Sequence, residues 1–210
     1  MQKSLAGLFI LFLGILNVSA QAPFMVKDIN TAQLSAKPSG MTTSGTTVFF
    51  AATDAVHGRE LWKTTGSEVS SVLVKDLNPS GNSNPSNFCN VNGIVFFTAT
   101  TPETGTELWK TDGTLAGTVL VADLISGAQG STPDQLTACN GKLFFSAKTR
   151  TVTPTGVIEA IKLFVSDGTT AGTKLLANTL VGPRNLTAVG NVLFLSGSSP
   201  GSLNGNQLLK

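Results

Sequence analysis

A single histidine limits the acid-base and metal chemistry open to this chain. His57 is the only histidine among the 210 residues, and it follows Asp54 in the stretch DAVHGRE. A histidine–aspartate pair can activate a serine, but the sequence lacks the motif of the sharp turn that presents such a nucleophile in many hydrolases. Without a second histidine or a neighbouring cysteine, a histidine-based metal site is not expected. We expect His57 to lie in an exposed loop without a catalytic role.

Aspartates recur at two kinds of position and raise the question of calcium. They are Asp28, Asp76 and Asp123 after short apolar runs, and Asp112 and Asp167 at the start of DGT turns. Calcium takes about six to eight oxygen ligands, whereas each copy here brings one or two carboxylates. We expect these side chains to accept hydrogen bonds from nearby backbone N–H groups. The sequence therefore predicts no metal or other cofactor, with calcium as the weaker alternative.

Glutamates are the remaining candidates for acid-base catalysis. A glycoside hydrolase needs two carboxylates roughly 5–10 Å apart, and Glu60, Glu107 and Glu159 qualify by residue type alone. Glu60 and Glu107 hold the same place in two copies of ELWK, which favours a structural role that is repeated along the chain. No residue departs from the repeat as an active site usually does. The sequence therefore predicts no catalytic residue and no enzyme.

Charge and cysteine content narrow the partners further. The formal net charge is +2, and the charged residues are scattered without a basic run, so nucleic acid is not expected as a partner. Cys89 and Cys139 have no metal-ligand spacing, and Val91 and Val189 take the repeat position of Cys139. We expect both cysteines to act as small buried apolar side chains. Pairing in an oxidising compartment is the alternative.

The first residues predict an export signal. Lys3 precedes the uncharged apolar run LAGLFILFLGIL (5–16), and small residues follow. The run is shorter than the ~20 residues that span a bilayer, and a cleavage site follows it. We expect a signal peptide over 1–20, with cleavage after Ala20, or after Ala22 as the alternative. The mature chain, 21–210, is then predicted to be exported without a membrane span, to the periplasm, the cell surface or the medium.

The candidate residues above lie in a sequence that repeats along the chain. ELWKTDGTLAGTVLV (107–121) has counterparts in ELWKTTGSEVSSVLV (60–74) and KLFVSDGTTAGTKLL (162–176). Trp62 and Trp109 are 47 residues apart, and repeats of ~40–50 residues are typical of propeller blades. The sequence divides into four units, which are expected to be blades: 24–71, 72–118, 119–173 and 174–210.

Each unit is predicted to hold four short strands. Val, Ile, Phe and Thr dominate, and apolar residues do not recur with the period of a helix. In the second unit the four predicted strands are VLVKDLN (72–78), SNFCNV (86–91), GIVFFTAT (93–100) and ELWK (107–110). The first strand of the first unit is FMVKDIN (24–30). Asn92-Gly93 and Asn140-Gly141 predict tight hairpins with positive φ angles.

The third strand of each unit indicates how the units pack. Runs such as IVFFTA and KLFFSA are apolar on both faces, so both faces must be covered. Small sheets arranged radially achieve this. We predict an all-β, propeller-like fold of four four-stranded antiparallel blades. Trp62, Trp109 and Phe164, on the expected outer strand, would pack between blades. Whether four blades close a ring or belong to a larger or incomplete propeller stays open.

These motifs resemble the bacterial ELWxxDGT repeat family, found in exported proteins of Bacteroidetes and myxobacteria. The strongest matches are ELWKTDGTLAGTVLVADL (107–124), SDGTTAGTKLL (166–176) and NGKLFFSA (140–147). The first unit has TTGSEVSS (64–71) in place of the DGTxAGT turn, and the last unit lacks both the Trp and the turn. The resemblance implies an exported, propeller-like repeat protein without an established activity.

The functional prediction is a non-catalytic module that binds or scaffolds an extracellular protein or glycan, at or outside the cell surface. It follows from the expected export, the polar loops and the missing catalytic groups. The segment TRTVTPTGVIEA (149–160) is unique to the third unit and is the expected place of a specific contact. A carbohydrate-active hydrolase of propeller fold and a truncated fragment of a larger secreted protein are the alternatives.

Overall fold

The structure is a computed structural model that describes residues 23–31, 35–177, 180–198 and 207–210. The signal peptide expected over 1–20 lies outside the described residues. Within them, all regular secondary structure is β, which confirms the predicted fold class. Fifteen strands form four antiparallel sheets, three with four strands and one with three.

The strands follow one another along the chain within each sheet. Sheet 1 contains β1 (Ser39–Ser44), β2 (Thr47–Asp54), β3 (Gly58–Thr64) and β4 (Val72–Lys75). Sheet 2 contains β5 (Ser86–Val91), β6 (Ile94–Thr101), β7 (Gly105–Thr111) and β8 (Val119–Ala122). Sheet 3 contains β9 (Asp134–Cys139), β10 (Lys142–Thr153), β11 (Gly156–Ser166) and β12 (Lys174–Ala177). Sheet 4 contains β13 (Val181–Val189), β14 (Val192–Ser198) and β15 (Gln207–Leu209).

The sheets and the sequence repeat are offset by one strand. The VLVK strand β4 was expected to open the second blade, but it pairs with β3 and completes sheet 1. β8 and β12 complete sheets 2 and 3 in the same way. The DGT turns therefore join neighbouring strands of one sheet instead of crossing between blades. The two strands joined by each turn are close in the sequence, and a short turn favours direct antiparallel pairing of the strands that it joins.

Two further differences follow from this offset. The ELWK strands β3, β7 and β11 are the third strands of their sheets and not the outermost ones. Residues 24–30 were expected to form a strand but have no strand pairing in the structure, because an outermost strand needs a sheet edge to pair with. Sheet 4 has three strands in the described residues, one fewer than predicted.

The tight hairpins between the first two strands of sheets 2 and 3 are confirmed. Asn92 and Gly93 both have positive φ angles (53° and 92°), and so do Asn140 and Gly141 (47° and 70°). Two consecutive positive φ angles are the requirement of the turn that matches the right-handed twist of the flanking strands. The Asn-Gly dipeptides therefore fix the register of both hairpins.

The sheets pack face to face, and the core lies between them. Trp109 of sheet 2 packs in one cluster with Phe49 and Leu61 of sheet 1. Phe164 of sheet 3 packs likewise with Phe96 and Leu108 of sheet 2. Trp109 and Phe164 thus fill the spaces between successive sheets, as predicted, whereas Trp62 packs, of the four sheets, against sheet 1 alone. Burial on both faces also explains why the middle strands are apolar throughout.

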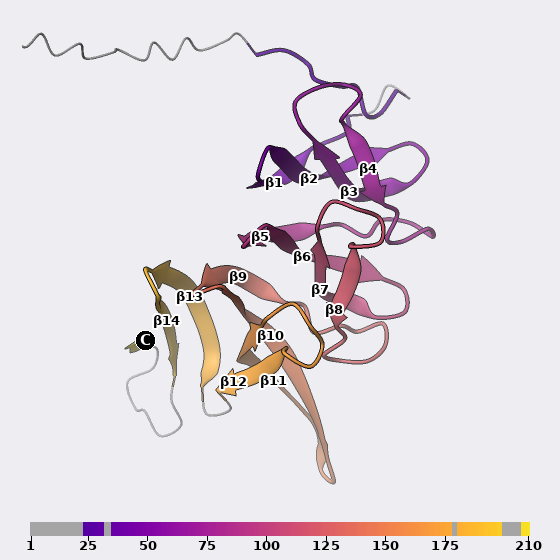
Figure 1. Ribbon diagram of the computed structural model, residues 1–210. Coiled ribbons are helices and arrows are strands. Elements are labelled where there is room, and N and C mark those ends of the chain that lie inside the picture. Colours follow the sequence, from indigo (N-terminus) through magenta and orange to yellow (C-terminus); the bar gives the residue numbers. More distant parts are fainter. Residues whose placement is uncertain (1–22, 32–34, 178–179, 199–206) are drawn as a thin grey trace, which may run out of the picture.

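The first strands of the four sheets lie next to one another on one side of the stack. Asn90 of β5 donates to the Thr43 carbonyl of β1, and Gln135 of β9 donates to the Pro183 carbonyl of β13. These contacts turn the stack into a curved arc, with sheet 1 and sheet 4 at its two ends (Figure 1). The sheets of the described residues do not close into a ring.

Candidate functional site

One end of the stack, here called the loop rim, gathers the loops that differ most between sheets. It consists of the β2–β3 and β6–β7 turns, the β10–β11 hairpin, and the β4–β5 and β8–β9 connections. Each connection folds back onto the neighbouring turn: Asn84 donates its N–H to the Arg59 carbonyl, and Thr132 donates to the Thr106 carbonyl. The rim therefore contains His57, the recurring glutamates and the unique segment 149–160.

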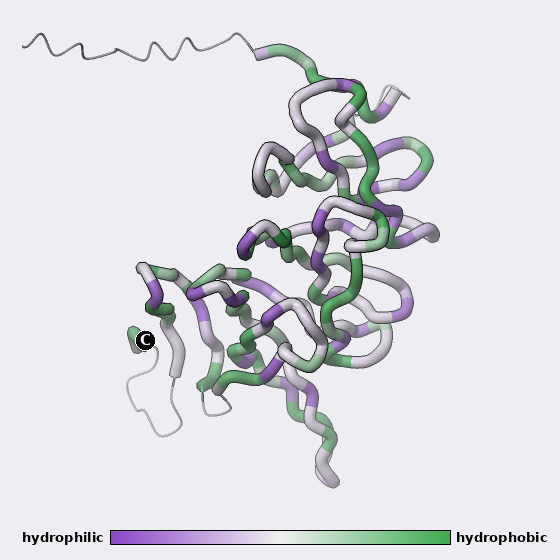
Figure 2. The backbone as a smooth tube through the Cα atoms, in the orientation of Figure 1, coloured by the Kyte–Doolittle hydropathy of each residue, from purple (hydrophilic) through white to green (hydrophobic). Residues whose placement is uncertain are grey.

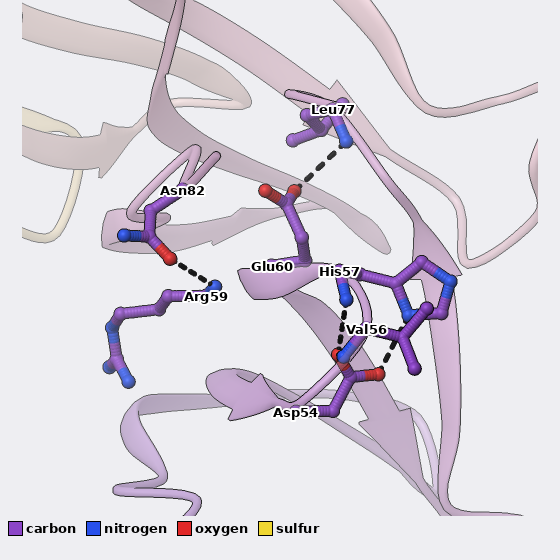
Figure 3. A network of polar contacts seen from close by, with 7 residues as sticks. All are labelled: Asp54, Val56, His57, Arg59, Glu60, Leu77 and Asn82. Carbon is purple, nitrogen blue, oxygen red and sulfur yellow. Dashed lines mark hydrogen bonds and ion pairs between the residues drawn. The ribbon is translucent and has the colours of Figure 1, made fainter. Parts of the chain in front are cut away.

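The two recurring glutamates are structural anchors for these connections. The Glu60 carboxylate is fully buried and accepts a hydrogen bond from the Leu77 N–H (2.9 Å, Figure 3). It also accepts hydrogen bonds from the Ser83 N–H (2.8 Å) and the Ser83 hydroxyl (2.5 Å). Glu107 repeats the arrangement one sheet further on, with the Ile125 N–H, the Ser131 N–H and the Ser131 hydroxyl as donors. Each carboxylate thus holds the loop that leads to the next sheet.

The three candidate glutamates differ in location and burial. Glu60, Glu107 and Glu159 lie on three different sheets, and Glu159 is exposed on the hairpin. Burial raises the pKa of both Glu60 and Glu107 above the ordinary value of 4.5, and the hydrogen bonds from Ser83 and Ser131 oppose the rise. The carboxylates of Glu60 and Glu107 are occupied by their own loops, in agreement with the structural role inferred from the repeat.

His57 is paired with Asp54 within the β2–β3 turn. The Asp54 carboxylate accepts the backbone N–H groups of Val56 (3.0 Å) and His57 (2.5 Å), and it lies 2.7 Å from Nδ1 of the His57 ring (Figure 3). The side chain of His57 is 36% exposed. The hydrogen bond to Asp54 raises the pKa of His57 above 6.5, partial burial lowers it, and the charges of Asp76 and Glu60 add to the rise.

The titration of His57 provides a direct test of this pairing. We expect Asp54→Asn to lower the pKa of His57, because the substitution removes the largest cause of its rise. The stability from the pair is complete below the unfolded-state pKa of His57 and is lost as the pH rises through its folded-state pKa. Since the chain has one histidine, an NMR titration of the imidazole Hε1 signal measures the change without assignment. Asp76→Asn should lower the pKa of His57 less than Asp54→Asn does. Equal effects of the two variants would contradict the conclusion that Asp54 is the main cause of the raised pKa.

The aspartates of the DGT turns act as local caps. Asp112 accepts hydrogen bonds from the N–H (2.8 Å) and the hydroxyl (2.7 Å) of Thr114, and Asp167 accepts the same pair from Thr169. These bonds hold the pKa of both carboxyl groups below their ordinary range. The role predicted for them, hydrogen bonding to local backbone, is confirmed at these two turns. Asp28 also accepts from a local backbone N–H, that of Asn30.

The described residues do not show a calcium-like cluster. No group of three or more His, Cys, Asp or Glu side chains among them is placed to hold a metal ion. Asp76 and Asp123 lie in different connections of the loop rim, and one buried oxygen of Asp76 lacks a hydrogen-bond partner among the described atoms. The two cysteines are unpaired in the structure: Cys139 is buried, and Cys89 is partly buried and packs against the cluster between sheets 2 and 3.

The unique segment 149–160 forms a hairpin that protrudes from sheet 3 (Figure 1). β10 and β11 pair without interruption from Leu143–Ser166 to Thr153–Gly156, well beyond the ladders of the other sheets. The pairings of β9 reach only Ser146, and those of β12 reach only Leu163. Both backbone edges of the hairpin are therefore unpaired over 149–160 among the described residues.

The hairpin exposes a mixed apolar and charged face. Cross-strand partners place Val152 opposite Val157 and Arg150 opposite Glu159, on the same face as Ile161. Val152 is 77% exposed and Val157 is 48% exposed, and Figure 2 shows hydrophobic positions along this part of the chain. Such exposure of β-branched apolar side chains is typical of an interaction surface.

A groove continues from this face into the loop rim. It has a volume of about 360 Å³, lies between sheets 3 and 4, and is lined by residues of β9, β10, β11 and β13. Lys148 and Ile161, a cross-strand pair at the base of the hairpin, line this groove together with Asp134 of sheet 3 and Pro183 and Arg184 of sheet 4. Sequence reasoning identified the segment 149–160 as a contact site without predicting its hairpin, and it missed Asp134 and Arg184. These two residues occupy the repeat position that Ser86 holds in sheet 2. The change from serine to a charged residue was the sequence signal that could have identified them.

Comparisons with known proteins do not assign a family or a function to this chain. No family model matches the chain, and no curated protein matches it. No helix among the described residues has the length and apolar character needed to span a bilayer. The hairpin with its groove is thus the candidate site, on grounds of structure alone.

Proposed function

We propose that this protein is a non-catalytic, exported binding module whose hairpin 149–160 and adjoining groove recognise an extended segment of an extracellular protein. The single observation behind the proposal is the hairpin itself, which has no counterpart in the described parts of the other sheets and projects exposed apolar side chains and unpaired backbone edges. The resemblance of the repeat to the ELWxxDGT family and the expected signal peptide support a place outside the cytoplasm.

The chemistry of the hairpin favours a peptide chain as the ligand. Unpaired strand edges accept an additional extended strand through backbone hydrogen bonds, a common mode of peptide recognition. The face with Val152 and Val157 offers apolar contacts, and Lys148 and Arg184 at the groove would pair with acidic side chains of the ligand. The hairpin has no aromatic side chain on which a sugar ring could stack, so a glycan is the less favoured ligand.

Removal of the hairpin is the decisive test. A variant in which Asn-Gly replaces 150–159 keeps a tight turn and leaves sheet 3 intact. We expect proteins captured from the extracellular fraction of the source organism by the unaltered protein to be lost with this variant. For a purified captured protein, biolayer interferometry should show at least a tenfold weaker affinity.

Glu103→Ala provides a matched control, because Glu103 lies in the shorter β6–β7 turn at the equivalent place in sheet 2. This variant should bind as well as the unaltered protein. Equal binding by a folded hairpin-deletion variant would refute the proposed site. Binding of the unaltered protein to a glycan array, with loss on hairpin deletion, would keep the site and replace the peptide by a glycan.

A further inference from the structure

A polar pocket lies at the loop rim between sheet 1 and the connection that leads to sheet 2. Its volume of about 540 Å³ falls within the range of ligand-binding pockets. Two of the lining residues are cationic, none is acidic, and all but one have polar side chains. The lining residues are Lys37, Pro38, Ser39, Thr53, Arg59, Asn82 and Asn84. This composition suits a polar ligand that carries negative charge.

The guanidinium of Arg59 is held in place at this pocket. One terminal nitrogen donates to the Lys37 carbonyl at 2.8 Å, and the other donates to the Ser39 hydroxyl. A guanidinium carries five N–H groups, and the remaining three have no acceptor among the described residues. Because the side chain is already ordered, a ligand that binds to it avoids the entropic cost of fixing it.

The amide of Asn82 adds a second set of donors. Its Oδ1 accepts the backbone N–H of Arg59 at 2.7 Å (Figure 3). A backbone N–H can only donate, so this contact fixes which end of the amide is the oxygen and leaves the NH₂ group at the other end. Figure 3 shows that nitrogen and the Arg59 guanidinium on one side of the β2–β3 turn, with Asp54 and His57 on the other.

Neighbouring carboxylates do not neutralise the pocket. The Asp54 carboxylate is paired with the His57 ring at 2.7 Å, and the Glu60 carboxylate is buried and occupied by donors of its own loop. Among the described residues neither Lys37 nor Arg59 forms an ion pair. Both positive charges are therefore available to an anion.

The two cations are specific to this pocket. The same backbone hydrogen bond recurs in sheets 1 to 3, from Thr53 to Ala36, from Thr100 to Ser83 and from Lys148 to Ser131. It aligns Lys37 with Asn84 and Thr132, and the strand register aligns Arg59 with Thr106 and Ile161. All four equivalent residues are uncharged. The repeat thus builds this arrangement without either cation, so the fold does not require them.

We propose that this pocket binds an acidic saccharide through a sugar carboxylate. The planar fork of Arg59 matches a carboxylate in two parallel hydrogen bonds, and the Lys37 ammonium adds a second positive charge. The amides of Asn82 and Asn84 and the hydroxyls of Ser39 and Thr53 are partners for the hydroxyl groups of the sugar. An acidic peptide fits less well, because Pro38 alone offers it an apolar contact. The site lies on other sheets than the hairpin and is independent of the function proposed for it.

Isothermal titration calorimetry of the unaltered protein with tetragalacturonate tests the ligand class. We expect binding at low ionic strength that weakens as sodium chloride is added, because the pocket is open to solvent and salt screens its charges. Maltotetraose, a neutral chain of the same number of sugars, should not bind detectably, and tetraglutamate should bind at least tenfold more weakly than tetragalacturonate. Absence of tetragalacturonate binding, or equal binding of any two of these three, would overturn the proposal.

Variants copied from the repeat locate the site. Arg59→Thr and Lys37→Asn introduce the residues that the chain itself has at the equivalent places, Thr106 and Asn84. Asn84 also has a positive φ angle (48°), as Lys37 has (44°), so both variants are compatible with the backbone. Each should bind tetragalacturonate at least tenfold more weakly while its far-UV circular dichroism stays unchanged.

Arg150→Thr is the matched control, because it removes the same charge from the hairpin. This variant, and the variant in which Asn-Gly replaces 150–159, should bind tetragalacturonate as the unaltered protein does. A loss of binding in either of them equal to that of Arg59→Thr would show that net charge or the hairpin is responsible and would overturn the assigned site. Undiminished binding by Arg59→Thr would do the same.

Discussion

Replacing Trp109 with alanine is expected to lower the free energy of unfolding by about 3–5 kcal/mol. The Trp109 ring is 9% exposed and packs between sheets 1 and 2, in the cluster that contains Phe49 and Phe97. The substitution leaves a cavity between two sheets whose backbones are fixed by their own hydrogen bonds, so the surroundings can collapse only in part. Urea denaturation followed by far-UV circular dichroism measures the loss.

Trp109→Phe is the matched control. The indole N–H of Trp109 has no hydrogen-bond partner among the described atoms, so phenylalanine removes an unpaired donor and keeps most of the apolar contact. We expect a loss below about 1.5 kcal/mol. Equal losses for the alanine and phenylalanine variants would show that packing between the sheets is not what the ring contributes.

Replacing Glu107 with alanine is expected to lower the free energy of unfolding by about 3 kcal/mol, because it leaves three buried donors without an acceptor. Those donors are the Ile125 N–H, the Ser131 N–H and the Ser131 hydroxyl. Glu107→Gln should cost much less. Its amide oxygen can accept both N–H groups from the position of Oε1, and its amide nitrogen can donate to the Ser131 hydroxyl.

The glutamine variant also isolates a pH dependence. Burial raises the pKa of Glu107 in the folded state, so the unfolded chain loses this proton first as the pH rises. The contribution of Glu107 to stability therefore falls between its unfolded-state pKa and its higher folded-state pKa. The free energy of unfolding of Glu107→Gln, relative to the unaltered protein, should rise across that interval and then level off. Denaturation curves at a series of pH values measure it; a constant difference would contradict the raised pKa.

Local sequence was sufficient for the strands and the turns. The Asn-Gly dipeptides and the DGT stretches determine their own backbone conformation, because their side chains and φ preferences act over a few residues. There are two exceptions: residues 24–30, which were predicted as a strand but pair with none, and β1, whose residues Ser39–Ser44 (SGMTTS) are mostly polar. The strand β1 forms because it pairs with β2 and contacts β5, neither of which is visible in its own composition.

Sequence alone could not fix the arrangement of strands into sheets. A repeated series of strands has the same sequence pattern whichever strand begins a sheet. The unit boundaries were therefore predicted at 72, 119 and 174, although β4, β8 and β12, which follow these boundaries, each complete the sheet of the preceding unit. The contact between Glu107 and Ser131 was hidden for a similar reason. The two residues are 24 positions apart, and only the fold of the loop rim brings them together.

The offset between sheet and repeat has a consequence for synthesis. The fourth strand of every complete sheet is encoded at the beginning of the next repeat, so a sheet stays one strand short until the ribosome has moved on into the following unit. Folding during translation should therefore advance in steps of about 47 residues, each step finishing the previous sheet and starting the next. Stalled chains released at a repeat boundary would carry an unpaired edge, which makes those lengths the ones most prone to aggregate.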